Sequence, residues 1–281
     1  MSQNKRKPQL HPSQMNMLFK CGEQFRRRYI ENEIIPPNMA LIVGSGTHRS
    51  QEKDLISKVE TGQLLDVEEI DSIATDYIKG EFQNGITLTD EEKEIGIKKV
   101  KGQAIDTAVK MARLHHKELA PIIEPKSVDH IERRLLVKMP NHPFDLAGTL
   151  DIQEKDDTVR DTKTSKRSPA KGDADKSFQL TFYALALLII DGKLPPKMTL
   201  DFLVKIRTPK VVVQPTVRTM DDIKVGLRRI ETAMKIIENE MWTPADPTSW
   251  ICSRDWCGYF QTCPYALGKK VFGYENQKTK D

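Results

Sequence analysis

Two acidic residues and one lysine stand at spacings that suit metal-assisted chemistry. Asp161 and Lys163 are separated by one residue, so in a strand their side chains point to the same face. If a three-residue loop at 155–157 joins this strand to the preceding one, Asp151 lies opposite Asp161, with Cβ atoms about 5 Å apart. Two carboxylates that close repel each other unless a proton or a cation lies between them. Magnesium or manganese, which prefer oxygen ligands, are the natural occupants.

Lys163 would then lie beside the metal, where an ammonium group can orient a water molecule or stabilise charge on a phosphate. The alternative is a solvated hairpin whose charged residues only face water. Spacing alone does not decide between these two interpretations.

The four cysteines, Cys21, Cys252, Cys257 and Cys263, form the second group with chemical potential. Three of them follow a C-x4-C-x5-C pattern, and the fourth stands more than 200 residues earlier. Intracellular proteins seldom keep disulfides, so a metal or cluster site is the better interpretation. Four thiolates suit either zinc or a [4Fe–4S] cluster. Such a site would join distant parts of the chain and act as a structural staple.

Composition sets the broad class. The chain has 281 residues, of which 38% are hydrophobic and 30% charged, as in a folded globular protein. The longest apolar stretch, Ala184–Ile190, is too short to cross a bilayer, and no signal-like segment follows the first lysines. We therefore expect a cytoplasmic protein without membrane contact. The net charge of +4, from 44 basic and 40 acidic residues, permits a polyanionic partner without requiring one.

The elements that must position these residues change in type near Pro125. Before Pro125, apolar residues recur at helical spacing. This pattern predicts a first helix from Ser13, a second helix that starts near 44–47 and carries His48, and helices over 66–119. After Pro125, the pattern predicts strands at 128–139, 144–153, 158–164, 199–206 and 211–217, with helices at 178–190 and from Asp221. We predict an α/β fold with a mixed central sheet flanked by helices, plus a helical insertion.

Four short motifs resemble those of the RecB-like exonucleases of the PD-(D/E)xK superfamily. They are Gly148–Asp151, Asp161–Lys163, Gly44–His48, and the pair Gln179 and Tyr183. The proline of the superfamily name is replaced by Leu150, and the resemblance extends from Ser13 to Tyr265. It implies a restriction-endonuclease-like core that hydrolyses DNA phosphodiester bonds with magnesium or manganese.

The resemblance also implies roles for individual residues. The metal ligands would be His48, Asp151, Asp161 and the carbonyl of Thr162, and the catalytic residues Asp151, Asp161, Lys163, Gln179 and Tyr183. His48 has the alternative of an ordinary structural histidine. Gln179 has the alternative of an ordinary hydrogen bond to the backbone, and Tyr183 has the alternative of a plain core residue. Glu132 matches an acidic position of the family and would either touch a second metal or pair with an arginine.

One branch of this family places a single cysteine in the first helix and three near the C-terminus, around an iron–sulfur cluster. Cys21, Cys252, Cys257 and Cys263 fit that layout, although the gap between Cys252 and Cys257 is wider than in some members. The resemblance therefore favours [4Fe–4S] over zinc. The aromatic residues of the same segment would shield the cluster from water; they are Trp250, Trp256, Tyr259 and Phe260.

We thus expect one nuclease domain over residues 1–281. Its segments would be N-terminal helices (13–60), a helical insertion (61–125), the nuclease core (126–240), a cluster segment (241–267) and a tail (268–281). The expected activity is exonuclease action on DNA ends or single strands in recombination, repair or processing. The alternative is an inactive DNA-binding subunit of a recombination or CRISPR adaptation complex. A homo-oligomer is compatible with either.

Overall fold

The computed structural model describes residues 7–254 and 256–266. The predicted tail at 268–281 lies outside the described residues, as does residue 267 of the predicted cluster segment. The helices are α1 (Pro12–Lys20), α2 (Gly22–Phe25), α3 (Met39–Thr61), α4 (Val67–Asn84), α5 (Asp90–Ile95), α6 (Ile97–Glu118), α7 (Phe178–Ile190) and α8 (Met220–Glu238). The strands are β1 (Gln9–Leu10), β2 (Ile131–Val137), β3 (Asp145–Gln153), β4 (Val159–Ser165), β5 (Met198–Val204) and β6 (Lys210–Thr216).

The six strands form one mixed sheet in the order β1-β3-β4-β5-β6, and β2 also pairs with β3. Strand β3 runs antiparallel to both β2 and β4, and β5 runs antiparallel to β6. The β4–β5 pair is parallel because α7 carries the chain across between these two strands. This sheet confirms the predicted α/β class with a mixed central sheet.

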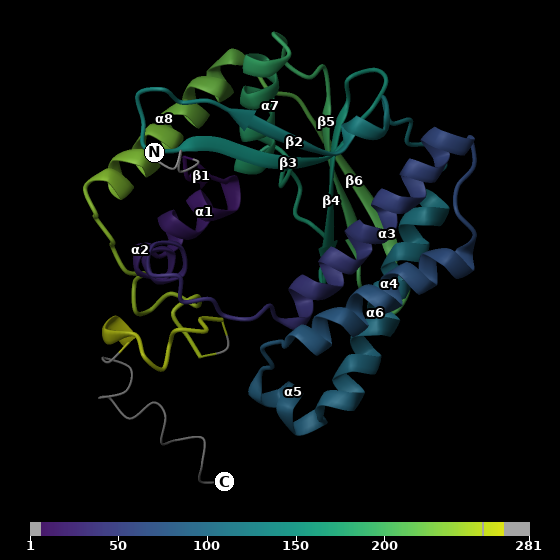
Figure 1. The fold of residues 1–281 in the computed structure, drawn as a ribbon, viewed down its shortest axis with the longest axis horizontal. Coiled ribbons are helices and arrows are strands. Elements are labelled where there is room, and N and C mark those ends of the chain that lie inside the picture. Colours follow the sequence, from purple (N-terminus) through teal and green to yellow (C-terminus); the bar gives the residue numbers. More distant parts are fainter. Residues whose placement is uncertain (1–6, 255, 267–281) are drawn as a thin grey trace, which may run out of the picture.

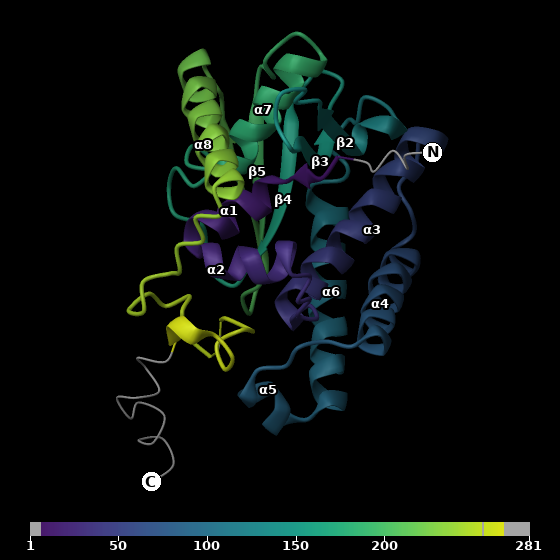
Figure 2. The same ribbon diagram turned by 60° about the vertical axis from the view of Figure 1, so that its left-hand side comes forward.

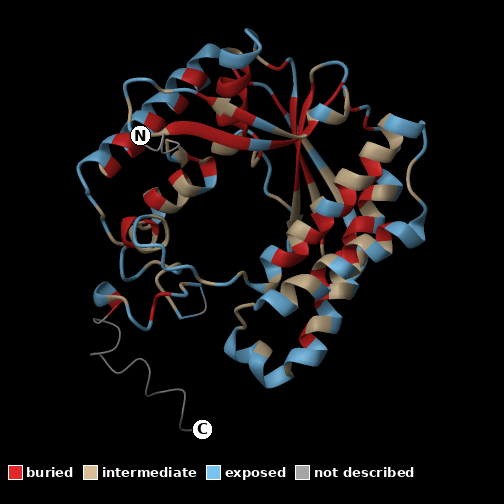
Figure 3. Cartoon of the chain, in the orientation of Figure 1, coloured by how far each residue is buried: buried red, intermediate tan, exposed pale blue. Residues whose placement is uncertain are grey.

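Helices cover both faces of the sheet (Figures 1 and 2). On one face, α1, α7 and α8 enclose the main core with apolar side chains of β2, β3 and β4; Leu18, Leu150, Phe182 and Met234 belong to it. On the other face, α3 and α6 pack on the sheet through Leu55, Met111, Ile152 and Leu203. The central strand β3 is buried along nearly all of its length (Figure 3).

The predicted helical insertion is a bundle of its own. Helix α4 packs against α3 and α6 through small and β-branched side chains such as Ile42, Ala74 and Ala104, and its outer face is exposed (Figure 3). Gly62 ends α3 with a φ of 79°, a conformation that suits a residue without Cβ. No helix in the described part of the chain is both long and apolar enough to span a membrane.

Most predicted boundaries are close to the observed ones. Cys21, predicted within the first helix, instead lies between α1 and α2 with extended backbone, and the strand predicted from 128 begins at Ile131, after a single helical turn. Three further differences concern β1, α1 and α3. Strand β1 has only two residues, too few to show a period in the sequence. Helix α1 begins after His11 rather than at Ser13, with Pro12 in its first turn. Helix α3 begins at Met39, five residues before the predicted 44–47 region, because Asn38 caps it through the backbone amide of Leu41.

Candidate functional site

The hairpin between β3 and β4 has the predicted register. Ile152 pairs with Arg160, and the two strands are joined by a tight turn at residues 155–157. The strand pairing ends at Ile152 and Arg160, and Asp151 and Asp161 are the next residues in the same register. The Asp151 carboxylate accepts a hydrogen bond of 2.8 Å from the backbone amide of Thr162, which orients it across the two strands.

Asp161 is fully buried and is paired with the lysine two residues later. The Lys163 Nζ lies 2.6 Å from its Oδ2, as expected for i and i+2 in a strand. Apart from this ion pair, neither oxygen of Asp161 accepts a hydrogen bond from the described residues. Burial raises the pKa of Asp161, and Asp151 adds to the rise, although Lys163 opposes it. Burial alone lowers the pKa of Lys163, but Asp161 and Asp151 outweigh it and raise this pKa. A carboxylate this poorly satisfied suits an additional cation.

Three side chains from three elements converge beside this pair. His48 of α3, Glu132 of β2 and Asp151 of β3 each offer one ligand atom, and these atoms all lie within 4.8 Å of one another. The Nδ1 of His48 is 3.3 Å from Oδ2 of Asp151 and 3.9 Å from Oε1 of Glu132. One imidazole and two carboxylates are a donor set that accepts magnesium or manganese.

Glu132, which sequence reasoning left as a secondary residue, is thus a full member of this set. Its φ is 51°, and it interrupts the pairing of β2 with β3 between Ile131 and Arg133. A non-glycine residue in this region is strained, and such strain is concentrated at functional sites. Burial, followed by the charges of Asp151 and Glu52, raises the pKa of Glu132 to about 8. A bound cation would relieve this repulsion.

Helix α7 closes the site from the other side through the predicted pair Gln179 and Tyr183. The Tyr183 hydroxyl donates to the carbonyl of Thr149, and it accepts from Nε2 of Gln179 at 2.6 Å. Burial and the nearby carboxylates raise the pKa of Tyr183, so the phenol stays a donor. A Cβ at Gly148 would lie 3.0 Å from Cε1 of Phe182 and 3.2 Å from Cε1 of Tyr183. The glycine of the Gly148–Asp151 motif therefore lets α7 approach β3.

Gly46 of α3, two residues before His48, also allows another element to approach closely. A Cβ there would meet Cδ1 of Tyr77 at 3.3 Å, so the ring of Tyr77 lies close against this turn. Tyr77 comes from α4 of the helical insertion and lines the same hollow as His48 and Glu132. In the sequence, Tyr77 falls within the stretch 66–119, for which the spacing of apolar residues predicted helix. Its only signal was an aromatic residue at helical spacing, which does not distinguish core from site.

The four predicted cysteines line one narrow cavity, although Cys21 is distant from the other three in the chain. They form no disulfide. The Cys21 sulfur accepts hydrogen bonds from the backbone amides of Gln24 (3.4 Å) and Ala245 (3.3 Å). Burial and the other three thiols raise the pKa of the Cys257 thiol. Such a pocket is costly for four separate thiolates and suits a metal or a cluster that holds them together.

The predicted aromatic shield of this pocket is only half correct. Tyr259 and Phe260 are buried, and Phe260 lines the cavity. Trp250 and Trp256 are instead 62% and 65% exposed and pack edge to face against each other with ring centroids 4.9 Å apart. The two indoles therefore cover part of each other at the surface and do not shield the cavity.

Comparison with known proteins agrees with this geometry. The family model of the PD-(D/E)XK nuclease superfamily matches residues 9–264. No curated protein matches the chain. Among solved structures, a "Putative exonuclease" from Eubacterium rectale is similar, with a TM-score of 0.55 and 13% identity over 93% of this chain and 90% of that one. The structure of SSO0001 has a TM-score of 0.42 and 13% identity over 95% and 90%. Because the family model covers most of its length, the chain belongs to the PD-(D/E)XK nuclease superfamily.

Proposed function

We propose that this protein is a magnesium- or manganese-dependent DNA exonuclease that acts on ends or single strands in recombination, repair or processing. The observation that carries the proposal is the convergence of His48, Glu132 and Asp151 within 4.8 Å, beside the buried pair of Asp161 and Lys163. A structural hairpin would gain nothing from gathering so many carboxylates, because their mutual repulsion destabilises the folded chain.

His48, Asp151, Asp161 and the Thr162 carbonyl are the proposed metal ligands, with Glu132 as a further one. The metal, when bound, neutralises charge on the phosphate and favours ionisation of a bound water. The ammonium of Lys163, held by Asp161, is placed to orient the attacking water and to stabilise the negative charge that develops on the phosphate.

Gln179 and Tyr183 act on the other side of the site. Because the Tyr183 hydroxyl is engaged with Thr149, Tyr183 fixes the strand that carries Asp151, and Gln179 keeps its second amide proton available for a water or a phosphate oxygen. The roles proposed for these two residues are therefore to position the site and to contact the substrate.

The test compares wild type with Lys163→Met on end-labelled single-stranded and blunt double-stranded DNA, with magnesium, manganese or EDTA. We expect mononucleotide or short products from the wild type that depend on the metal. The variant should cut at least about 100-fold more slowly and keep its affinity for DNA, since an electrostatic contact to the developing charge contributes about this much. Undiminished cleavage by Lys163→Met would refute the mechanism. Binding without any cleavage by the wild type would favour the inactive-subunit alternative.

We also propose that Cys21, Cys252, Cys257 and Cys263 hold a [4Fe–4S] cluster. The proposal is supported by the single cavity that Cys21 and the three C-terminal cysteines line together, and by the resemblance of this layout to the cluster-binding branch. Zinc is the alternative occupant of four cysteine ligands. Anaerobic purification with iron, sulfide and zinc analysis tests this assignment: one zinc and no iron per chain would overturn it.

A further inference from the structure

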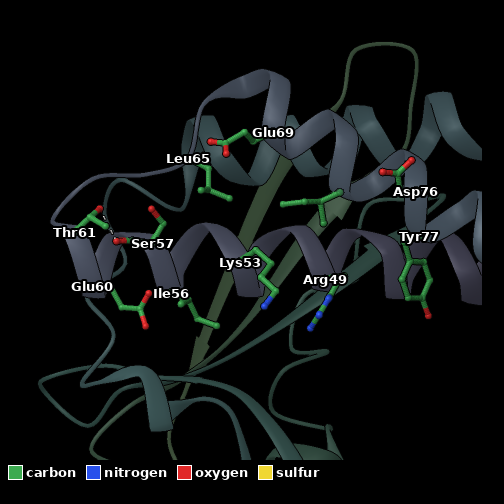
Figure 4. A pocket seen from close by; sticks show the side chains of 11 residues that line it. Arg49, Lys53, Ile56, Ser57, Glu60, Thr61, Leu65, Glu69, Asp76 and Tyr77 are labelled. Atoms are coloured by element: carbon green, nitrogen blue, oxygen red, sulfur yellow. Dashed lines mark hydrogen bonds between the residues drawn. The ribbon is translucent and has the colours of Figure 1, made fainter.

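A groove leads away from the candidate metal site along the helical insertion. The hollow that contains His48 and Glu132 is also lined by Ser45, Arg49, Glu52 and Tyr77. A second, larger hollow lies between α3 and α4, and it shares Arg49 and Tyr77 with the first (Figure 4). The two hollows therefore adjoin, and the groove is an extension of the site.

The part of the groove nearest the site carries two cations. Arg49 and Lys53 project from successive turns of α3, about 6 Å apart along the helix axis (Figure 4). Lys53 makes no hydrogen bond or ion pair with the other described residues. Arg49 pairs with Glu52 at 2.6 Å, but its side chain is 46% exposed, and such surface pairs contribute little. Both cations are available to an anion that enters the groove.

Tyr77 adds an aromatic surface at the same end of the groove. Its ring is held against Gly46 and is half-buried, and its hydroxyl has no hydrogen-bond partner within the described residues. Aromatic rings fixed in this way stack with nucleic acid bases of any sequence, because every base has a π-face. Arg49 and Lys53 are spaced like neighbouring phosphates of a nucleic acid strand, and the ring of Tyr77 lies beside them. The two cations are therefore suited to contact the backbone of a single strand while the ring stacks on one of its bases.

The charge reverses farther from the site. Glu60 lies about 16 Å beyond Arg49 along α3, and Glu69 of α4 lines the same hollow (Figure 4). These carboxylates would repel a continuing phosphate backbone. The favourable part of the groove is therefore short: it extends from Arg49 to Lys53 on α3, while Asp76 of α4 and Glu52, which pairs with Arg49, add negative charge at its end near Tyr77.

We infer that this groove binds the short single-stranded stretch of DNA next to the scissile phosphate, with Arg49 and Lys53 on its phosphates and Tyr77 stacked on a base. This assignment rests on the proposed nuclease function and makes the helical insertion one wall of the substrate path. Selectivity for a single strand follows, since the bases of a duplex are already stacked and paired and leave no face for Tyr77.

The experiment measures binding of a fluorescein-labelled single-stranded 12-mer by anisotropy with calcium in place of magnesium, and KM and kcat for cleavage with magnesium. We expect Lys53→Glu to weaken binding and raise KM about tenfold or more, with kcat changed less than about threefold. The slope of log K against log salt should fall by about 0.7 for each lost phosphate contact. Lys110→Glu is the matched control: it is an exposed lysine on α6, away from the groove, and should behave as wild type.

Tyr77 is tested by Tyr77→Phe and Tyr77→Leu. The phenylalanine variant should retain binding, whereas the leucine variant should lose about tenfold on the normal 12-mer and nothing on a 12-mer with abasic sites. Circular dichroism melting of each variant verifies folding. Binding within twofold of wild type in both Lys53→Glu and Tyr77→Leu would overturn the groove assignment. Absence of cleavage by the wild type would refute the nuclease proposal alone, since the binding measurements still test the groove.

Discussion

Glu132 offers a test of the crowded carboxylates that does not depend on any nuclease assay. Its pKa in the folded protein rises from 4.5 to about 8, first through burial and then through the charges of Asp151 and Glu52. The folded chain therefore holds a proton that the unfolded chain has released. The proton on Glu132 therefore stabilises the folded chain relative to the unfolded one. This stabilisation is complete below about pH 4.5 and is lost as the pH rises through about 8.

The size of this contribution follows from the same shift. One pKa unit corresponds to about 1.36 kcal/mol, which sets an upper limit of about 5 kcal/mol. Because 32% of the Glu132 side chain is exposed, solvent screening reduces the contribution to about 2–3 kcal/mol. With an unfolding entropy of about 2.1 cal/mol/K per residue, this corresponds to about 4 °C in Tm. About two-thirds of this change falls between pH 5.5 and pH 8.5, so titration of Glu132 should make the metal-free protein melt about 3 °C lower at pH 8.5 than at pH 5.5.

The assay is differential scanning fluorimetry with EDTA or with 10 mM magnesium between pH 5.5 and 8.5. Magnesium binds the charged carboxylate, so its stabilising effect should be larger at pH 8.5 than at pH 5.5. Glu132→Gln, which has no carboxylate to titrate, should lose most of the pH slope and most of the magnesium effect. Glu94→Gln, at an exposed position in α5, should keep both. Identical slopes for Glu132→Gln and wild type would show that the reasoning is wrong.

Three further predictions concern the supporting structure. Gly148→Ala places a Cβ 3.0 Å from Cε1 of Phe182 and should lower the free energy of unfolding in urea by about 1–3 kcal/mol; a neutral effect would contradict the close approach of α7. Arg160→Met removes the guanidinium 2.9 Å from the buried carboxylate of Asp201 and should cost about 3–5 kcal/mol in the same assay, unlike a surface arginine. Cys257→Ser should remove the iron and the visible absorbance of the anaerobically purified protein. It should also lower the free energy of unfolding by several kcal/mol, on the order expected when the closure of a long loop is lost. Full iron content in this variant would exclude Cys257 as a ligand.

Strand periodicity explains why part of the site was predictable. Side chains at i and i+2 share a face of a strand, so the pairing of Asp161 with Lys163 follows from the sequence alone. The length of the turn at 155–157 determined the register that places Asp151 beside the backbone of Thr162. A glycine within a strand pattern is also a signal for the close approach of α7 at Gly148, although the sequence analysis used this residue only as part of a motif.

Contacts between distant segments were less accessible. The φ of 51° at Glu132 turns its side chain toward His48, and strand alternation does not predict such a departure. Tyr77 reaches the site because α4 packs on α3, whereas its position in an apolar stripe indicated only burial. Residue type indicated burial for Trp250 and Trp256, but both rings lie at the surface, where they pack against each other.

For this protein, the sequence by itself determined what is local: the strand and helix types, the acidic and basic pair on one strand, and the presence of four thiols without disulfide partners. Which elements meet depends on the tertiary structure. It brings side chains of α3, β2 and β3 close enough to share a metal ion, Glu132 included, and it places Cys21 in one cavity with the C-terminal cysteines, as the family resemblance implied. The physical reason is that periodicity specifies the face on which a side chain lies, whereas the partner of that face depends on the packing of the whole chain.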